Sequence, residues 1–225
     1  MEITAKRIAS QPPSADTAST WLDRHLVSWT RMASSNWAEK YPYRPEVKFR
    51  IAHTGSHFVI QFDVEETSIR AVALHDNGRV WEDSCCEFFV APDAAGTYYN
   101  FECNCIGTLL VASGSERENR QLASPEVLCG IARKSTFRHK EIPLSQGEYH
   151  WRLELIIPVS SFFCHDIGTL SGKTMRCNFY KCGDKLHRPH FLSWSPVGTL
   201  TPDFHRPDYF GTLHFSRHFP EMVLT

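Results

Sequence analysis

The sequence carries no excess of charge of either sign and no long apolar run. Its 24 Lys and Arg residues balance 25 Asp and Glu residues, which leaves a formal net charge of −1 at pH 7. A protein that binds nucleic acid or an anionic membrane surface through charge needs a basic patch, and this composition gives no case for one. No apolar run reaches the roughly 18 residues of a membrane-spanning helix. We therefore expect neither nucleic acid nor a membrane as a partner.

An export signal is also missing from the first 20 residues. A secretory signal peptide contains an apolar core of about 7–15 residues. Residues 8–13 read Ile-Ala-Ser-Gln-Pro-Pro, which is too short and too polar for such a core. Taken as a complete chain, the sequence predicts a cytoplasmic protein. A trimmed N-terminus would instead allow a periplasmic or secreted one.

Common catalytic motifs are absent as well. There is no G-x-S-x-G elbow around a serine and no glycine-rich phosphate loop before a helix. The carboxylate pairs Glu65-Glu66 and Glu82-Asp83 are adjacent in sequence, so their side chains would face opposite ways on a strand. Eight Cys and twelve His residues single out no nucleophile–base pair. The sequence assigns no catalytic residue and favours a protein that is not an enzyme.

Short strand patterns separated by turn residues make up most of the chain. With 225 residues, of which 42% are hydrophobic, the chain can bury a substantial core. Residues 47–52 and 58–64 flank a Thr-Gly-Ser connection and predict a β-hairpin. Further strands are expected at 69–74, 86–90, 98–105, 109–112, 128–137, 149–157, 174–180 and 211–215. This spacing predicts an all-β fold, an antiparallel β-sandwich of the jelly-roll or immunoglobulin-like kind.

The first 40 residues differ from the rest and predict a partly helical N-terminal extension. Residues 1–20 are rich in Ser, Ala, Thr and Pro, which is typical of a loose segment. Apolar residues recur at helical spacing within 16–32, and Thr20 is the expected cap. The Tyr-Pro-Tyr-Arg-Pro run at 41–45 interrupts regular structure. We therefore divide the chain into an extension, 1–40, and a sandwich domain, 41–225.

The cysteines are expected to be small buried hydrophobes in a reducing compartment, because most lie in apolar strand patterns. One metal alternative remains open. Cys177, Cys182, His187 and His190 have the spacing C-x4-C-x4-H-x2-H, and sulfur and imidazole are zinc ligands. The gap between the cysteines is not the usual one, and Cys177 could face the core. We predict no metal and no cofactor.

An ordered set of segments resembles carbohydrate-binding module family 9 in its stand-alone form. These segments are 81–89 (WEDSCCEFF), 98–108 (YYNFECNCIGT), 178–183 (NFYKCG) and 210–213 (FGTL). The resemblance implies a β-sandwich that holds a sugar between two Trp rings, and Trp81 and Trp194 are the positions that match best. Some family members bind calcium. The turn at 92–96 (PDAAG) offers one carboxylate, too few for six to eight oxygen ligands.

The predicted sugar site combines aromatic faces with polar side chains. Aromatic rings desolvate the C–H faces of a pyranose, and polar groups bind its hydroxyls. Trp81 and Trp194 would supply the faces, and Glu87 lies close to Trp81 in sequence. Asn104, Asn178 and Lys181 complete the predicted set. We expect non-catalytic binding of a mono- or oligosaccharide. A carbohydrate-active enzyme with unidentified catalytic residues and a protein-interaction sandwich remain as alternatives.

Overall fold

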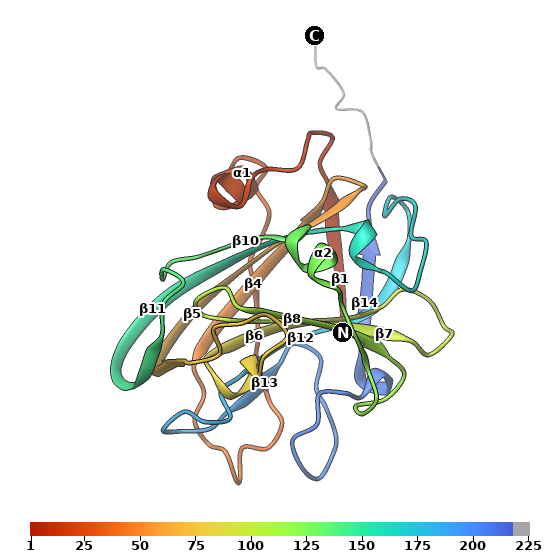
Figure 1. Cartoon of the computed structure of the whole chain (residues 1–225). Helices are drawn as coiled ribbons and strands as arrows, with labels where there is room; N and C mark the ends of the chain where they lie inside the picture. The colour runs from red at the N-terminus through yellow and green to blue at the C-terminus, as the bar shows by residue number, and fades with distance from the viewer. Residues whose placement is uncertain (218–225) are drawn as a thin grey trace.

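The computed structural model describes residues 1–217. The last eight residues of the predicted sandwich domain, 218–225, lie outside that part. Most of the fold is β-structure (Figure 1). Its strands are β1 (Glu2–Arg7), β2 (Thr30–Arg31), β3 (Ser34–Ser35), β4 (Glu46–His53), β5 (His57–Ala71), β6 (Cys85–Ala91), β7 (Tyr98–Asn104), β8 (Leu109–Gly114), β9 (Gln121–Leu122), β10 (Ala132–Ser135), β11 (Ile142–Pro158), β12 (Thr174–Cys182), β13 (Phe191–Ser193) and β14 (Gly211–Phe215).

The helical segments are short. There are two α-helices in the described residues, α1 (Ala18–Arg24) and α2 (Pro125–Cys129). Single 3-10 turns occur at Ala15–Thr17, Val80–Glu82, Val159–Ser161 and Pro207–Tyr209. Within residues 1–217, no helix is long and apolar enough to cross a membrane.

The strands form two layers that are joined along one edge. We call the layer β14-β12-β6-β7-β8-β9 sheet A and the layer β10-β11-β5-β4 sheet B. The N-terminal strand β1 connects them, because Glu2–Ala5 pair with β14 and Lys6–Arg7 pair with β4. Both of these pairings are parallel, whereas the neighbouring strands within each sheet run antiparallel. The antiparallel sandwich is therefore confirmed, with β1 as its parallel closing strand.

Aromatic side chains from both layers fill the space between the sheets. Phe179 of sheet A stacks on Phe49 of sheet B with ring centroids 3.8 Å apart, and on its neighbour Phe88 at 4.8 Å. Alternation along each strand sends every second side chain out of this core. Thus Phe88 faces sheet B, while Phe89 lies in a separate apolar cluster on the outer face of sheet A. That outer cluster carries the site described below.

The N-terminal region is more integrated than the sequence predicts. Residues 2–7 form β1 rather than a loose segment, and Ala5 is fully buried. The predicted helix exists but is shorter, and Thr20 lies inside it rather than at its cap. This helix packs Leu22 on the outer face of sheet B, where Arg50 bonds Asp23 at 2.6 Å. The prediction of a strand through 128–137 is also wrong at its start, where α2 and Gly130 precede β10.

Candidate functional site

A cavity of about 460 Å³ lies on the outer face of sheet A. Its floor is built from side chains of β6, β7, β8 and β12 that point away from the central core. The strand register places Glu87 opposite Glu102, and Phe89 opposite Asn100, so these four share one face. Leu110, Ala112 and Cys182 complete the floor. The sheet thus presents a mixed polar and apolar surface at the bottom of a hollow.

Loops from distant parts of the chain form the walls. Four aromatic side chains contribute: Tyr41 after β3, Trp81 before β6, Phe191 at the start of β13 and Phe204 after β13. Ionisable side chains lie between them: Arg117, Arg120, Asp184, Asp203 and His205. Arg117 and Asp203 approach each other at 3.7 Å. The walls therefore offer aromatic surface together with charges that are partly paired within the protein.

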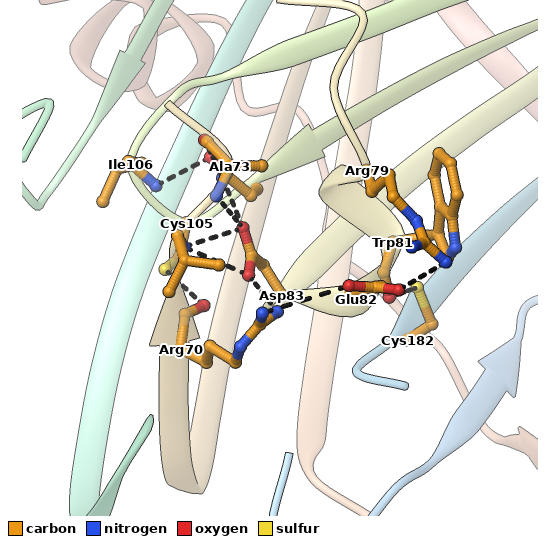
Figure 2. Close-up of polar contacts among 11 residues, drawn as sticks. Arg70, Ala73, Arg79, Trp81, Glu82, Asp83, Cys105, Ile106 and Cys182 are labelled. Carbon is orange, nitrogen blue, oxygen red and sulfur yellow. Dashed lines mark hydrogen bonds and ion pairs between the residues drawn. The ribbon is translucent and has the colours of Figure 1, made fainter. Parts of the chain in front are cut away.

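The short turn that carries Trp81 is held by a buried carboxylate (Figure 2). Asp83 is fully buried and accepts hydrogen bonds from Arg70 Nη1 at 2.6 Å and from Asn104 Nδ2 at 2.9 Å. The backbone N–H groups of Val72 and Ala73 donate to the same carboxylate. A buried charge is stable only with such donors. Asp83 therefore fixes the Val80–Glu82 turn against sheet A.

Two further contacts orient the Trp81 turn from the cavity side. The Cys182 sulfur lies 3.5 Å from the Trp81 carbonyl oxygen, and the backbone N–H of Asp184 donates to the same oxygen at 3.2 Å. The Arg79 guanidinium lies over the Trp81 ring at 5.7 Å and also pairs with Glu82 (Figure 2). Trp81 itself is only partly buried, so part of its ring remains available to a ligand.

The polar floor forms a connected network. Asn100 donates to Glu102 Oε1 at 2.8 Å, and Arg120 Nε donates to Asn100 Oδ1 at 3.0 Å. The Arg120 guanidinium lies 4.1 Å from the centre of the Tyr98 ring and also donates to the Tyr98 carbonyl. Next to these hydrogen bonds, the Cys182 thiol donates to Glu87 Oε1 at 3.0 Å. The floor is thus preorganised before any ligand arrives.

Burial perturbs the acids of this cavity. It raises the pKa of Glu87 well above its usual value, and the neighbouring Glu102 adds to the rise. Burial raises the pKa of Glu102 to about 7, although the hydrogen bond from Asn100 opposes the rise. Burial also raises the pKa of Asp184 to about 6. Burial therefore favours the protonated form of Glu87, and that form can donate as well as accept a hydrogen bond.

Of the six predicted site residues, Trp81 and Glu87 line the cavity. The other four do not. Trp194 is 2% exposed and lies in the central core, where its ring meets Phe49 and Phe179 edge to face. Its backbone N–H bonds the Phe179 carbonyl beside β13, which turns the side chain inward. The prediction that Trp194 offers an open face to a ligand is therefore wrong in this structure.

The remaining three predicted residues have structural partners instead. Asn104 donates to Asp83 and accepts from the backbone of Ile106 and Thr108, which shapes the turn after β7. Asn178 exchanges hydrogen bonds with the backbone of Ser195. Lys181 is fully buried and pairs with Glu66 at 2.9 Å. These side chains do not line the cavity.

Several cavity residues escaped the sequence-based prediction. Glu102 was recognisable as sharing a strand face with Asn104, but only its register opposite Glu87 places it on the floor. Arg120 lies in a charged connection whose composition suggests a solvated loop. Its hydrogen bond to Asn100 joins residues 20 positions apart, and the sequence around Arg120 does not indicate it. The aromatic walls at Tyr41, Phe191 and Phe204 depend on loop packing.

The zinc alternative on Cys177, Cys182, His187 and His190 is wrong. Cys177 lies in the core between the sheets, whereas Cys182 lies in the cluster on the outer face of sheet A. His190 is buried and its Nε2 lies 2.8 Å from Lys181 Nζ. The cysteines are all free thiols, and the expectation of burial is correct for all but Cys129 and Cys164. Cys85, Glu87 and Cys182 form one convergent group, and Asp63, Glu65 and His150 form another on sheet B.

Comparison with known proteins identifies the family of this chain. The model of carbohydrate-binding family 9 matches residues 16–215. The chain belongs to this family. A solved structure from Bacteroides uniformis, named a "putative carbohydrate-binding protein", is 49% identical to this family 9 chain. The match covers 96% of this chain and 99% of that one, with a TM-score of 0.93.

More distant family 9 structures share the fold. A family 9 module from Caldicellulosiruptor kristjanssonii in complex with glucose has a TM-score of 0.62 and 11% identity, and the match covers 99% of this chain and 100% of that one. A module from the same organism in complex with cellotriose gives the same TM-score with 13% identity, covering 100% of this chain and 98% of that one. No curated protein matches the sequence.

Proposed function

We propose that this family 9 chain binds a neutral mono- or short oligosaccharide in the cavity on sheet A, without transforming it. The observation that carries the proposal is the combination of aromatic walls with a buried polar floor in one hollow. A volume of about 460 Å³ falls within the range of roughly 300–1,000 Å³ that is usual for ligand pockets. Family membership supports the same class of ligand.

The cavity matches the chemistry of a pyranose ring. The partly exposed ring of Trp81 can cover an apolar C–H face, and the walls at Tyr41 and Phe191 supply further aromatic surface. The hydroxyls at the rim of the sugar would meet Glu87, Asn100 and Glu102 on the floor. Because burial favours the protonated form of Glu87, this carboxyl group can donate to a hydroxyl oxygen as well as accept.

The charges favour a neutral sugar over an anionic one. Arg117 pairs with Asp203, and Arg120 donates to Asn100 and to backbone carbonyls, so both guanidinium groups already have partners within the protein. A uronate or sulfate group would also meet the carboxyl groups of the floor. Anionic sugars should therefore bind less well than their neutral counterparts.

The arrangement of the two glutamates on the floor favours binding over hydrolysis. Glycosidases place two carboxyl groups on either side of the scissile bond. Glu87 and Glu102 lie side by side on neighbouring strands, so both approach a bound ring from the floor. A pair on one side can hold hydroxyls but does not flank a glycosidic bond.

A calorimetric titration with glucose and with cellotriose tests the proposal. We expect saturable heats for the wild type and for Trp21→Phe, a control on α1 across the opposite sheet, and no saturable heat for Trp81→Ala. Calorimetry is preferred to Trp fluorescence here because Trp81→Ala also removes a reporter. Unchanged affinity in a folded Trp81→Ala variant would contradict the site. If the wild type gave no saturable heat with any of a wider panel of neutral sugars, the proposed function would be contradicted.

A further inference from the structure

We propose that Cys85, Cys182 and Glu87 form a binding site for a thiophilic divalent metal ion such as Zn²⁺, at the floor of the cavity. One ligand atom of each residue, two thiol sulfurs and a carboxylate oxygen, lies within 4.8 Å of the others. Residues 1–217 contain two sets of three possible metal ligands that lie close together, and this is the set in which all three residues are buried. The metal site does not depend on sugar binding, although both would use Glu87.

The strand register assembles the three ligands without any loop. Cys182 of β12 lies directly opposite Cys85 of β6. Glu87 follows two residues after Cys85, so it projects from the same face of β6. The thiol of Cys182 already bonds Glu87 Oε1 at 3.0 Å. Three donors on two paired strands are held more rigidly than donors on a loop.

The spacing suits a tetrahedral ion. Zinc bonds to thiolate at about 2.3 Å and to carboxylate oxygen at about 2.0–2.2 Å, so neighbouring ligand atoms lie roughly 3.5–3.8 Å apart. Ligand atoms that now lie between 3.0 Å and 4.8 Å from one another would need to move by only about 1 Å. Two thiolates also favour zinc over the hard ions calcium and magnesium, which take oxygen ligands.

The fourth position would open into the cavity. Glu87 and Cys182 line the cavity, whereas Cys85 lies beneath it and is fully buried. Three protein ligands with an open position for water are the arrangement of reactive rather than purely structural zinc sites. A water or a sugar hydroxyl could occupy that position. Metal binding would therefore be coupled to whatever the cavity holds.

The ion would replace protons that burial now retains. The two thiols and the Glu87 carboxyl lose up to three protons when the metal binds, and the resulting cluster of three anions and one dication carries a charge of −1. Lys181 on β12 favours this anionic cluster, while Glu102 on β7 and Asp184 beyond β12 oppose it. Affinity should rise with pH, because each ligand must be deprotonated.

Co²⁺ and Zn²⁺ are suitable probes, added to the reduced protein in a background that carries Cys129→Ser and Cys164→Ser. This background removes the two exposed thiols, which would otherwise bind metal on the surface. We expect one equivalent of Co²⁺ to give thiolate-to-metal charge-transfer absorption, and one equivalent of Zn²⁺ to displace it. Glu87→Gln should weaken binding, and Cys85→Ala or Cys182→Ser should weaken it by more than the roughly 10- to 100-fold that changes outside a ligand set cost.

Cys177→Ser is the matched control, because Cys177 is equally buried on β12 but faces the other side of sheet A. It should retain the Co²⁺ spectrum. Both Cys85→Ala and Cys85→Ser are used, so that one of them tests the site if the other fails to fold. Absence of a 1:1 complex, or a spectrum that survives in folded Cys85→Ala, would overturn the proposal.

Counting the free thiols before and after reduction distinguishes metal binding from disulfide formation. If Cys85 and Cys182 instead form a cross-strand disulfide in air and bind no metal after reduction, the metal site is refuted. Sugar calorimetry on Cys85→Ala, whose side chain does not line the cavity, should match the wild type without metal. A failure of sugar binding therefore leaves the Co²⁺ result intact, and a failure of metal binding leaves the sugar result intact.

Discussion

Two tryptophans with similar sequence surroundings have opposite environments. Each is followed by a polar residue, Glu82 or Ser195, in a loop-like segment, which suggests an open ring in each case. Trp81 lies on a 3-10 turn at the edge of the cavity, whereas Trp194 fills the core between Phe49 and Phe179. The difference arises from the partners that the fold brings to each ring. Phe49, which packs against Trp194, lies more than 50 positions away from it in the sequence.

Trp194→Ala should therefore destabilise the fold strongly. Removal of a buried Trp side chain costs about 3–5 kcal/mol, because apolar burial is lost and a cavity remains. Trp81→Ala should cost less than about 1.5 kcal/mol, since its ring is only partly buried and faces the hollow. Equilibrium unfolding in urea measures both values. Equal destabilisation by the two substitutions would contradict this assignment of roles.

At the scale of elements, the position of Trp81 depends on a carboxylate that no ligand would touch. Asp83 collects hydrogen bonds from Arg70, from Asn104 and from two backbone N–H groups, and so ties the Val80–Glu82 turn to β5 and β7. The residues that bind and the residues that position are thus distinct. Asn104 belongs to the second kind, although its polarity suggested the first.

Asp83→Asn should weaken sugar binding without removing any contact to the sugar. The amide keeps one acceptor oxygen but turns its NH2 group toward donors, which leaves buried groups unpaired at a cost of about 1–3 kcal/mol. The turn would then move and carry Trp81 with it. Calorimetric affinity and urea stability measured on the same sample would show both losses.

Glu82→Gln is the matched control for this prediction. It alters the adjacent residue of the same turn, whose pair with Arg79 is largely exposed on the arginine side and whose contact with Arg70 is long, at 4.0 Å. If Asp83→Asn lost the expected stability but kept the affinity of the wild type for sugar, Asp83 would not be needed to orient Trp81.

The elements with local patterns were predictable, and those defined by distant partners were not. Strands such as β4, β8 and β14 follow from alternation and turn residues, and β14 coincides with its predicted range 211–215. The strand β1 alternates polar and apolar residues over only five positions, and its pairing depends on the edges that β14 and β4 offer. Similarly, Glu87 follows Trp81 closely in sequence, but Asn100 and Arg120 enter the site only through register and loop packing.

At the scale of the whole molecule, buried ionisable groups make the stability of the fold depend on pH in opposite directions. In Asp63, burial by itself raises the pKa, but hydrogen bonds from Arg152 and His150 outweigh it and lower the pKa. Burial lowers the pKa of His53 to about 4 and of His205 to about 3. These groups lose their stabilising contribution as the pH falls. The acids of the cavity act in the opposite direction.

Glu102 should make the protein less stable as the pH rises from about 4.5 to about 7. Its pKa is raised in the folded state, so its contribution is fully present below the unfolded value of 4.5 and is lost as the pH passes the folded value of about 7. The shift corresponds to on the order of 3 kcal/mol; burial causes it, and Asn100 and Arg120 oppose it. Glu102→Gln remains neutral and should not show this loss.

Urea unfolding of the wild type and of Glu102→Gln, compared at each pH, isolates this contribution from Asp63 and the histidines, because they are common to both proteins. The stability of the wild type relative to the variant should fall between pH 4.5 and about 7 and level off above it. Glu46→Gln, which alters an exposed carboxylate paired with Arg31 on sheet B, should give a nearly flat difference. A difference for Glu102→Gln that stays constant or grows with pH would mean that the Glu102 carboxyl is ionised in the folded protein, and that the cavity floor offers an acceptor where we expect a donor.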